Sequence, residues 1–310
     1  MTELLNTPKK KKKVVLLDNF IGISFVAFLL LITGGLLSIF LLNPAVKFLL
    51  DAVAPGFTAT GTWKTIEHYM SFLGIWILTP IFLALSASNR PILKALTTKT
   101  KGNNWKMFAL GLGVGLGMNL LCAFIAMANG DIRLTFSSFR PISCLVIFAA
   151  VFVQSSSEEL LCRVFVYHRM MRRYGKPVLA VLVNSVFFAM NHIFNDGISF
   201  LAMLNIFAYG ILFSAMVIYL DSPWATMSTH AAWNFCQNIL LGLPNSGTVL
   251  PYSVFKLEGA AATDSFAYSV AFGLESTITA SVTLIGMAGL IAWWGIKHKT
   301  VLTDIWNDEA

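Results

Sequence analysis

The stretch FIGISFVAFLLLITGGLLSIFLL, residues 20–42, decides the fold class because it contains no charged side chain. A helix needs about 20 mostly apolar residues to cross the ~30 Å hydrocarbon core of a bilayer. This stretch is long enough to cross and too long for the apolar region of a secretory signal, and it ends in Asn43-Pro44 without a clear small-residue cleavage site. We therefore expect an uncleaved first membrane helix.

The composition of the whole chain leads to the same class. Of 310 residues, 56% are hydrophobic and 12% are charged, whereas an ordinary soluble domain has about 25% charged residues. This leaves too little polar surface for a water-soluble globule, and disordered chains have the opposite composition. The net charge of +7 would favour nucleic acid in a soluble protein, but here the cations cluster between apolar runs. The chain is predicted to be an integral membrane protein with no nucleic-acid partner.

Eight segments are long and apolar enough to be predicted spans. They are residues 19–42, 69–87, 107–128, 143–165, 177–194, 198–220, 224–243 and 269–296. With the amino terminus in the cytoplasm, most of the 22 Lys and Arg residues fall on the cytoplasmic side, as the positive-inside rule requires. The predicted fold class is an all-α polytopic membrane protein with about eight transmembrane helices and both termini cytoplasmic.

The predicted organisation is one helical membrane domain, residues 19–296, with a motif core at about 140–245. A basic cytoplasmic tail, 1–18, precedes it and holds Lys9–Lys13. A second cytoplasmic tail, 297–310, follows it.

Two sets of small side chains are assigned to packing. The first set is spaced for close contact between helices in lipid and lacks the pattern of a nucleotide-binding loop: Gly111, Gly113, Gly115 and Gly117. The second set lies inside apolar segments without a C-x-x-C spacing: Cys122, Cys144, Cys162 and Cys236. These cysteines are predicted to be buried thiols, not disulfides or zinc ligands.

Ionisable side chains inside predicted spans are candidates for a functional site, because each costs about 2.5–3.5 kcal/mol on insertion scales. They fall in three helices: Glu158, Glu159 and Arg163 in one, His192 in the next and His230 in the third. Each helix also has a pair at i,i+4 spacing, which places both members on one helix face: Glu159 with Arg163, Phe188 with His192, and His230 with Asn234. The turn at 174–177 lies roughly 25 Å from both Glu158 and His192. We therefore expect the two side chains to meet in one cavity, in the cytoplasmic half of the membrane.

Two chemistries fit these residues. In the first, Glu158 activates a water while His192 and His230 stabilise charge or transfer protons. Asn234 then donates a hydrogen bond to the developing oxyanion. In the second, His192, His230 and Glu158 bind a divalent metal such as Zn²⁺ with an open water position. No H-E-x-x-H motif supports the metal, and the residues alone leave both chemistries open.

Read in order, the motifs Glu158-Glu159-x-x-x-Arg163, Phe188-x-x-x-His192 and His230-x-x-x-Asn234 resemble those of the CPBP family. This family comprises the type II CAAX prenyl endopeptidases and the Abi-type, or bacteriocin-processing, intramembrane proteases. The resemblance covers about residues 140–245 and implies an eight-helix membrane endopeptidase, either metal-dependent or glutamate-dependent.

The resemblance also assigns roles to individual residues. It implies that Glu158 is the catalytic glutamate and that His192, His230 and Asn234 complete the site. Glu159, Arg163 and Phe188 would occupy supporting positions. One departure is Val164, which stands where many members have Gly after the motif Arg. The prenylated substrate of the eukaryotic relatives is not part of the expectation, because no feature outside the core matches a substrate class.

The predicted function is therefore an intramembrane endopeptidase that hydrolyses a peptide bond in or near the membrane. Its expected location is a bacterial plasma membrane, and its expected partners are the lipid bilayer and a membrane-associated peptide or protein. The alternative is a non-catalytic Abi-type immunity protein or membrane-protein-binding scaffold that keeps the motif residues. A transporter that uses the same residues as a proton relay is a third hypothesis, for which the sequence offers no inverted repeat.

Overall fold

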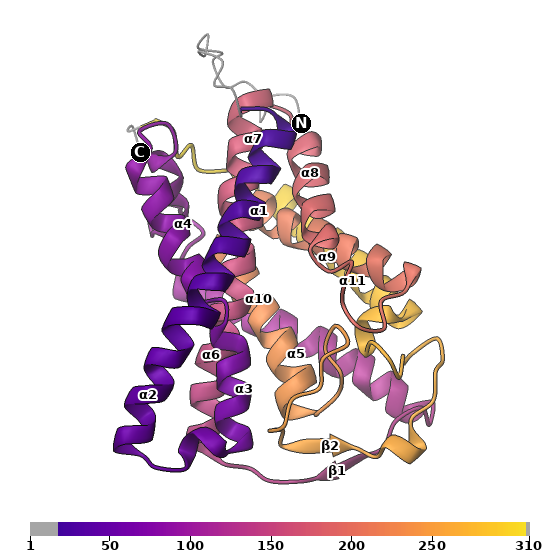
Figure 1. The fold of residues 1–310 in the computed structure, drawn as a ribbon. Helices are drawn as coiled ribbons and strands as arrows, with labels where there is room; N and C mark the ends of the chain where they lie inside the picture. Colours follow the sequence, from indigo (N-terminus) through magenta and orange to yellow (C-terminus); the bar gives the residue numbers. More distant parts are fainter. Residues whose placement is uncertain (1–17, 308–310) are drawn as a thin grey trace.

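The computed structural model describes residues 18–307 and is mostly helical. The predicted tail at 1–18 therefore lies, except for its last residue, outside the described residues, as does the end of the tail at 297–310. The α-helices are α1 (Phe20–Leu37), α2 (Asn43–Val53), α3 (Gly61–Met70), α4 (Leu73–Leu85), α5 (Trp105–Ala128), α6 (Pro141–Glu159), α7 (Tyr167–Tyr174), α8 (Pro177–Met190), α9 (Phe200–Leu220), α10 (Pro223–Asn234) and α11 (Ile278–Lys297). Figure 1 shows how they are arranged.

Short elements connect these helices. Between residues 18 and 307, π-helical turns continue α1, α6 and α10: Ser38–Leu42, Leu160–Val166 and Phe235–Leu240. The 3₁₀ turns of this part of the chain lie at Phe57–Ala59, Arg90–Leu96, Gly259–Ala261 and Leu274–Ser276. Strands β1 (Leu134–Phe136) and β2 (Phe255–Leu257) form an antiparallel ribbon in which Thr135 pairs with Lys256.

Within the described residues, six helical runs are long and apolar enough to cross a membrane: Phe20–Val53, Gly61–Leu85, Trp105–Ala128, Pro141–Tyr174, Phe200–Leu220 and Ile278–Lys297. This agrees with a multi-pass membrane protein. The other two predicted spans correspond to the shorter apolar helix α8 and to α10 with its π-helical continuation. The eight crossings therefore stay a prediction.

The predicted last span, 269–296, is wrong at its start. Residues 269–277 are turns and a short 3₁₀ segment, and the helix begins at Ile278. Thr277 caps it, because its hydroxyl accepts a hydrogen bond from the Ala280 N–H and so satisfies one of the free amides of the first turn.

Helix α10 is held against α5 by glycines. A Cβ at Gly111 would lie 2.4 Å from the Ala225 carbonyl oxygen, and one at Gly115 would lie 2.2 Å from the Thr229 carbonyl oxygen. Only glycine allows the two backbones to approach this closely. The predicted packing role is thus confirmed for Gly111 and Gly115. It is wrong for Gly113 and Gly117, where a Cβ would have no neighbour within 4 Å.

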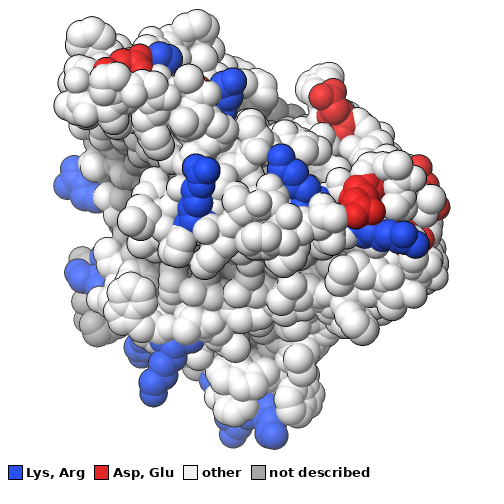
Figure 2. Space-filling model, turned by 90° about the horizontal axis from the view of Figure 1, so that it is seen from below, with Lys and Arg blue, Asp and Glu red and all other residues white. Residues whose placement is uncertain are grey.

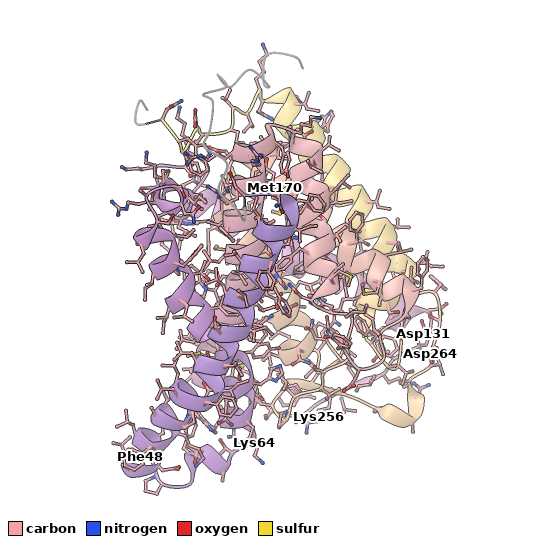
Figure 3. The ribbon with its side chains drawn as sticks, turned by 45° about the horizontal axis from the view of Figure 1, so that its top comes forward. Phe48, Lys64, Asp131, Met170, Lys256 and Asp264 are labelled. Carbon is pink, nitrogen blue, oxygen red and sulfur yellow. The ribbon has the colours of Figure 1, made fainter. Side chains whose placement is uncertain are left out.

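Both ends of the described chain meet helix α7. Arg169 donates a hydrogen bond to Asp18, and the guanidinium of Arg172 lies 4.2 Å from the centre of the Trp306 ring. In Figure 1 this end lies opposite the β1–β2 ribbon. Figure 2 looks onto that opposite end, where basic and acidic side chains are scattered over a largely uncharged surface. Lys64 and Lys256 lie toward it, far from Met170 at the α7 end (Figure 3).

Candidate functional site

Three helices supply the predicted site residues. Glu158 and Glu159 end α6, His230 and Asn234 lie on α10, and His192 lies two residues beyond the end of α8. A π-helical turn begins directly after Glu159, and another directly after Asn234. Such turns are often found at functional sites. The three helices that carry the site residues, α6, α8 and α10, begin with Pro141, Pro177 and Pro223. The fixed φ of proline and its missing N–H favour the first turn of a helix.

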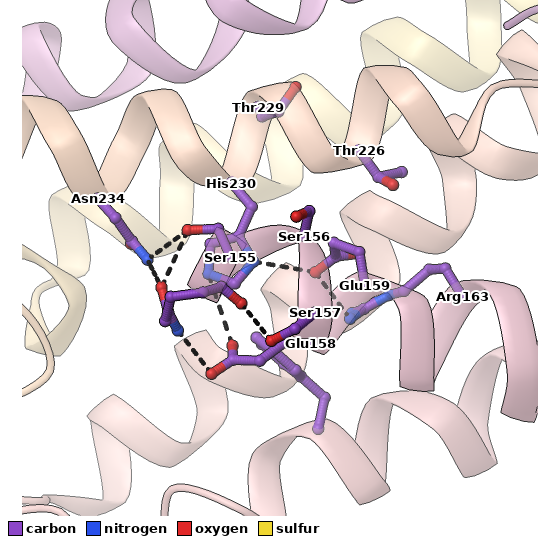
Figure 4. A network of polar contacts seen from close by, with 12 residues as sticks. Ser155, Ser156, Ser157, Glu158, Glu159, Arg163, Thr226, Thr229, His230 and Asn234 are labelled. Carbon is purple, nitrogen blue, oxygen red and sulfur yellow. Dashed lines mark hydrogen bonds and ion pairs between the residues drawn. The ribbon is translucent and has the colours of Figure 1, made fainter. Parts of the chain in front are cut away.

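The Glu159 carboxylate lies at the centre of a buried ion pair. Its Oε1 accepts hydrogen bonds from Arg163 Nη1 at 3.2 Å and from His230 Nδ1 at 3.0 Å (Figure 4). The side chains of Glu159 and Arg163 are both 0% exposed. Because a carboxylate can only accept, His230 Nδ1 must carry a proton. Nε2 of His230 is therefore the nitrogen that is directed at Glu158.

Phe188 packs against three of these side chains. The Arg163 guanidinium lies 4.5 Å from the centre of its ring, in the geometry of a cation–π contact. The same ring meets the His192 ring edge-on at 4.9 Å and the His230 ring at 5.9 Å. Its backbone carbonyl is 2.9 Å from His192 Nδ1, so this nitrogen donates and Nε2 of a neutral His192 is free to accept a proton.

Glu158 has one bonded and one unbonded carboxyl oxygen. Its Oε1 accepts a hydrogen bond from Gln154 Nε2 at 2.7 Å. Its Oε2 lies 3.8 Å from His230 Nε2 and has no hydrogen-bond partner within the described residues. A buried unpaired carboxyl oxygen is costly, and here it can accept a proton from a water molecule.

Asn234 joins the same network. Its Nδ2 donates to Gln154 Oε1 and to Ser155 Oγ, each at 3.1 Å, and Figure 4 shows these bonds beside Glu158. Gln154 thus connects the Asn234 amide to the Glu158 carboxylate.

These groups line one cavity of about 470 Å³. Glu158, His192, His230 and Asn234 all contribute to its wall. Apolar side chains of α1 and of its π-helical continuation line another part of it: Leu31, Ile32, Leu36 and Ile39. The site therefore combines convergent polar groups with an apolar wall, as ligand sites do.

The four predicted site residues are thus brought together, while their chemical roles stay predictions. Sequence reasoning missed Gln154, four residues before Glu158, although a polar residue at that helical spacing was a readable signal. It also missed Gln237, Asn245 and Glu275, which form a second polar cluster beside Asn234. Asn245 and Glu275 lie in irregular segments, where no periodic pattern could indicate them.

The metal alternative has no ready ligand cage. Across residues 18–307, no group of three or more His, Cys, Asp or Glu side chains is arranged so that it could hold a metal ion. We therefore derive the chemistry of the site from its protein groups.

The arrangement defines a helical membrane protein with a buried glutamate–histidine site. Residues 140–236 match the family model described as type II CAAX prenyl endopeptidase Rce1-like. The match covers just under a third of the chain, contains all three motifs, and confirms the predicted resemblance to the CPBP family. It supports a protease activity. No curated protein and no solved structure matches the chain.

Proposed function

We propose that the protein is an intramembrane endopeptidase in which Glu158 activates the attacking water. The observation that carries the proposal is the buried and unpaired Oε2 of Glu158, a residue of the cavity wall, at 3.8 Å from His230 Nε2. A carboxylate in this position can take a proton from a water placed between it and a peptide carbonyl carbon.

The steps follow from the groups around the cavity. Glu158, with His192 as a second acceptor, takes one proton from water, and the hydroxide adds to the carbonyl carbon. The Asn234 amide stabilises the negative charge on the carbonyl oxygen of the tetrahedral intermediate, while His230 Nε2, the acceptor nitrogen of its ring, faces Glu158 and can share the proton taken from water. When the C–N bond breaks, the proton held by Glu158 moves to the leaving nitrogen, so that a free acid and an amine are released.

The proposed substrate is a membrane-associated peptide or protein segment with apolar residues near the scissile bond. This class is supported by the apolar side chains that α1 and its π-helical continuation place in the cavity wall, of which Ile32, Leu36 and Ile39 are also exposed to the surroundings. Toward α7 the chain is closely packed, because every residue from Leu160 to Met170 is buried. The substrate therefore enters beside α1, away from the basic end.

The proposed topology has eight crossings, with both termini on the cytoplasmic side of a bacterial plasma membrane. The cations at the α7 end support this orientation under the positive-inside rule. The eight crossings take α8, which is shorter than the other spans, and α10 with its π-helical continuation, which is not among the six long apolar runs. The buried side chains of both helices include polar ones, which pack against neighbouring helices.

The test is cleavage of a quenched peptide library by the purified protein in nanodiscs. Glu158→Gln should lower kcat by about 10²–10⁴-fold, the range for a lost general base. The change is isosteric, and the new amide keeps an oxygen for Gln154. Glu258→Gln is the matched control: Glu258 is an exposed carboxylate in the outer loop, so cleavage should not change.

Each other outcome has a defined meaning. Equal cleavage by the wild type and Glu158→Gln would overturn the proposal. A wild type that cleaves nothing yet retains its cellular phenotype would identify a non-catalytic scaffold or immunity protein. Activity that a strong chelator abolishes and zinc restores would assign the water to a metal ion.

A further inference from the structure

A second buried carboxyl group, Glu275, lies close to the proposed site but outside the residues that match the family model. It is in the 3₁₀ turn before α11 and is 3% exposed. Its Oε1 accepts hydrogen bonds from Asn245 Nδ2 at 2.9 Å and from Trp233 Nε1 at 3.4 Å. Its Oε2 accepts one from Gln237 Nε2. Three donors thus converge on one carboxylate, two from α10 with its π-helical continuation and one from the loop that follows it.

Asn245 connects this carboxylate to Asn234. The same Asn245 Nδ2 that donates to Glu275 also donates to Asn234 Oδ1, at 3.2 Å. With its oxygen held there, the Asn234 amide, which lies in the cavity wall, directs its two N–H groups at Gln154 and Ser155, and a substrate oxyanion would replace one of these two acceptors. This is the orientation that donation to an oxyanion requires.

The chain of hydrogen bonds has one consistent direction because it ends on groups that can only accept. In its ionised form, which prevails above about pH 7, Glu275 has no proton to donate, so it fixes Asn245 with its NH₂ group between Glu275 and Asn234. On the other side, Asn234 donates to Gln154, and Gln154 donates to Glu158. A reversed Asn234 amide would direct its NH₂ group at that of Asn245.

Gln237 cannot compensate for a change at Glu275. Its Nε2 also donates to the Pro244 carbonyl oxygen, and its Oε1 accepts from Asn119 Nδ2 at 2.8 Å. Turning this amide over would break both bonds. An amide in place of the Glu275 carboxylate would therefore direct its NH₂ group at another donor, on either the Gln237 or the Asn245 side.

We infer that Glu275 is a positioning residue that orients the oxyanion-binding amide of Asn234 through Asn245. The inference rests on the proposed function and extends the site beyond the matched residues 140–236, to Gln237, Asn245 and Glu275. Glu275 does not touch the substrate in this arrangement. Its effect on the reaction passes entirely through the direction of one amide group.

The first test compares the kinetics of Glu275→Gln with those of the exposed control Glu258→Gln. Loss of an oxyanion donor costs about 10²–10³-fold in kcat, so a misdirected donor should cost about 10- to 100-fold. KM should stay within about twofold, because the interaction is made in the transition state. The control should match the wild type in both constants.

The decisive test is a double-mutant cycle with Asn234→Ala. If Glu275 acts through Asn234, adding Glu275→Gln to Asn234→Ala should lower kcat no further. Losses that multiply would show that Glu275 acts elsewhere and would overturn the inference. A Glu275→Gln variant with wild-type kcat would also overturn it, while the loss of cleavage in Glu158→Gln would leave the proposed function standing.

A readout without catalysis covers the case in which the wild type cleaves no peptide, so that the proposed function fails. The melting temperatures of the wild type, Glu275→Gln, Asn234→Ala and the double variant, all measured in detergent, show whether Glu275 and Asn234 are physically coupled. A double variant that is destabilised by less than the sum of the two single variants would support the hydrogen-bond chain. Strictly additive shifts would overturn it.

Discussion

Helix α10 contacts two buried carboxyl groups that are stabilised in different ways. His230 binds Glu159, which also pairs with the guanidinium of Arg163. Trp233, one turn further along, binds Glu275, for which every described side-chain donor is neutral. One carboxylate is therefore compensated by an opposite charge, whereas the other relies on oriented dipoles.

The difference shows which property each position needs. An ion pair inside low-dielectric surroundings keeps both groups charged and fixes the geometry between them, which suits a group that holds His230 in one tautomer. Neutral donors compensate a carboxylate less completely, and burial raises the pKa of Glu275 to about 7. The Glu159–Arg163 ion pair lies within the residues that match the family model, and Glu275 lies beyond them.

The largest expected effect comes from removing the charge that compensates Glu159. Arg163→Met should destabilise the protein by about 3–5 kcal/mol, because it strands a buried carboxylate. The methionine fills the space between Phe188 and Phe213, which now flank the guanidinium at 4.5 and 5.1 Å. Thermal unfolding in detergent measures the loss.

The double variant Arg163→Met/Glu159→Gln is the control for this prediction. It removes both charges and should recover most of the lost stability, since a neutral pair has no desolvated charge. If the double variant melts no higher than Arg163→Met alone, the ion pair is not what stabilises this part of the fold.

The next prediction is a pH dependence of stability that arises from Glu275. Its pKa is raised from 4.5 to about 7 in the folded state, so the folded protein binds this proton more tightly than the unfolded chain. The free energy of unfolding should therefore fall as pH rises from about 4.5 to 7, by at most about 3 kcal/mol. Above about pH 7, the contribution of Glu275 to the free energy of unfolding should no longer change with pH.

The difference in melting temperature between the wild type and Glu275→Gln, followed across this range, isolates the contribution. The titratable side chains that face Glu275 are Tyr69, Tyr209, Tyr268 and Cys122. Tyrosine and cysteine are largely neutral in this window, so they should not obscure the trend. A difference that does not change with pH would contradict the raised pKa.

The same contrast explains what could be predicted from the sequence. Glu159, Arg163, His192 and His230 lie at helical spacings inside apolar segments, where each ionisable group is conspicuous. The helical class and the joint cavity followed from that. Glu275 lies in a segment predicted as part of a membrane helix but found as turns up to Ile278.

The partners of Glu275 were equally hidden, for a physical reason. Asn245 contacts it across 30 positions of sequence, through a loop whose path depends on tertiary packing and not on local propensity. The glycines of α5 show a similar limit. Their spacing predicted close packing, but only the orientation of the helix could separate the two that meet α10 from the two that do not.

The smallest expected effect comes from displacing α10, the helix that contacts both Glu159 and Glu275. In Gly111→Ala the new Cβ would meet the Ala225 carbonyl oxygen at 2.4 Å, so α10 must shift. Overpacking of this kind costs about 1–3 kcal/mol. Because α10 carries His230 and Asn234, kcat should fall together with the melting temperature.

Gly113→Ala makes the same chemical change two residues along, where a Cβ meets nothing within 4 Å. It should leave kcat unchanged and raise stability by about 0.5–1 kcal/mol, the usual gain of alanine over glycine inside a helix. Equal effects of the two substitutions would mean that α5 does not set the position of α10.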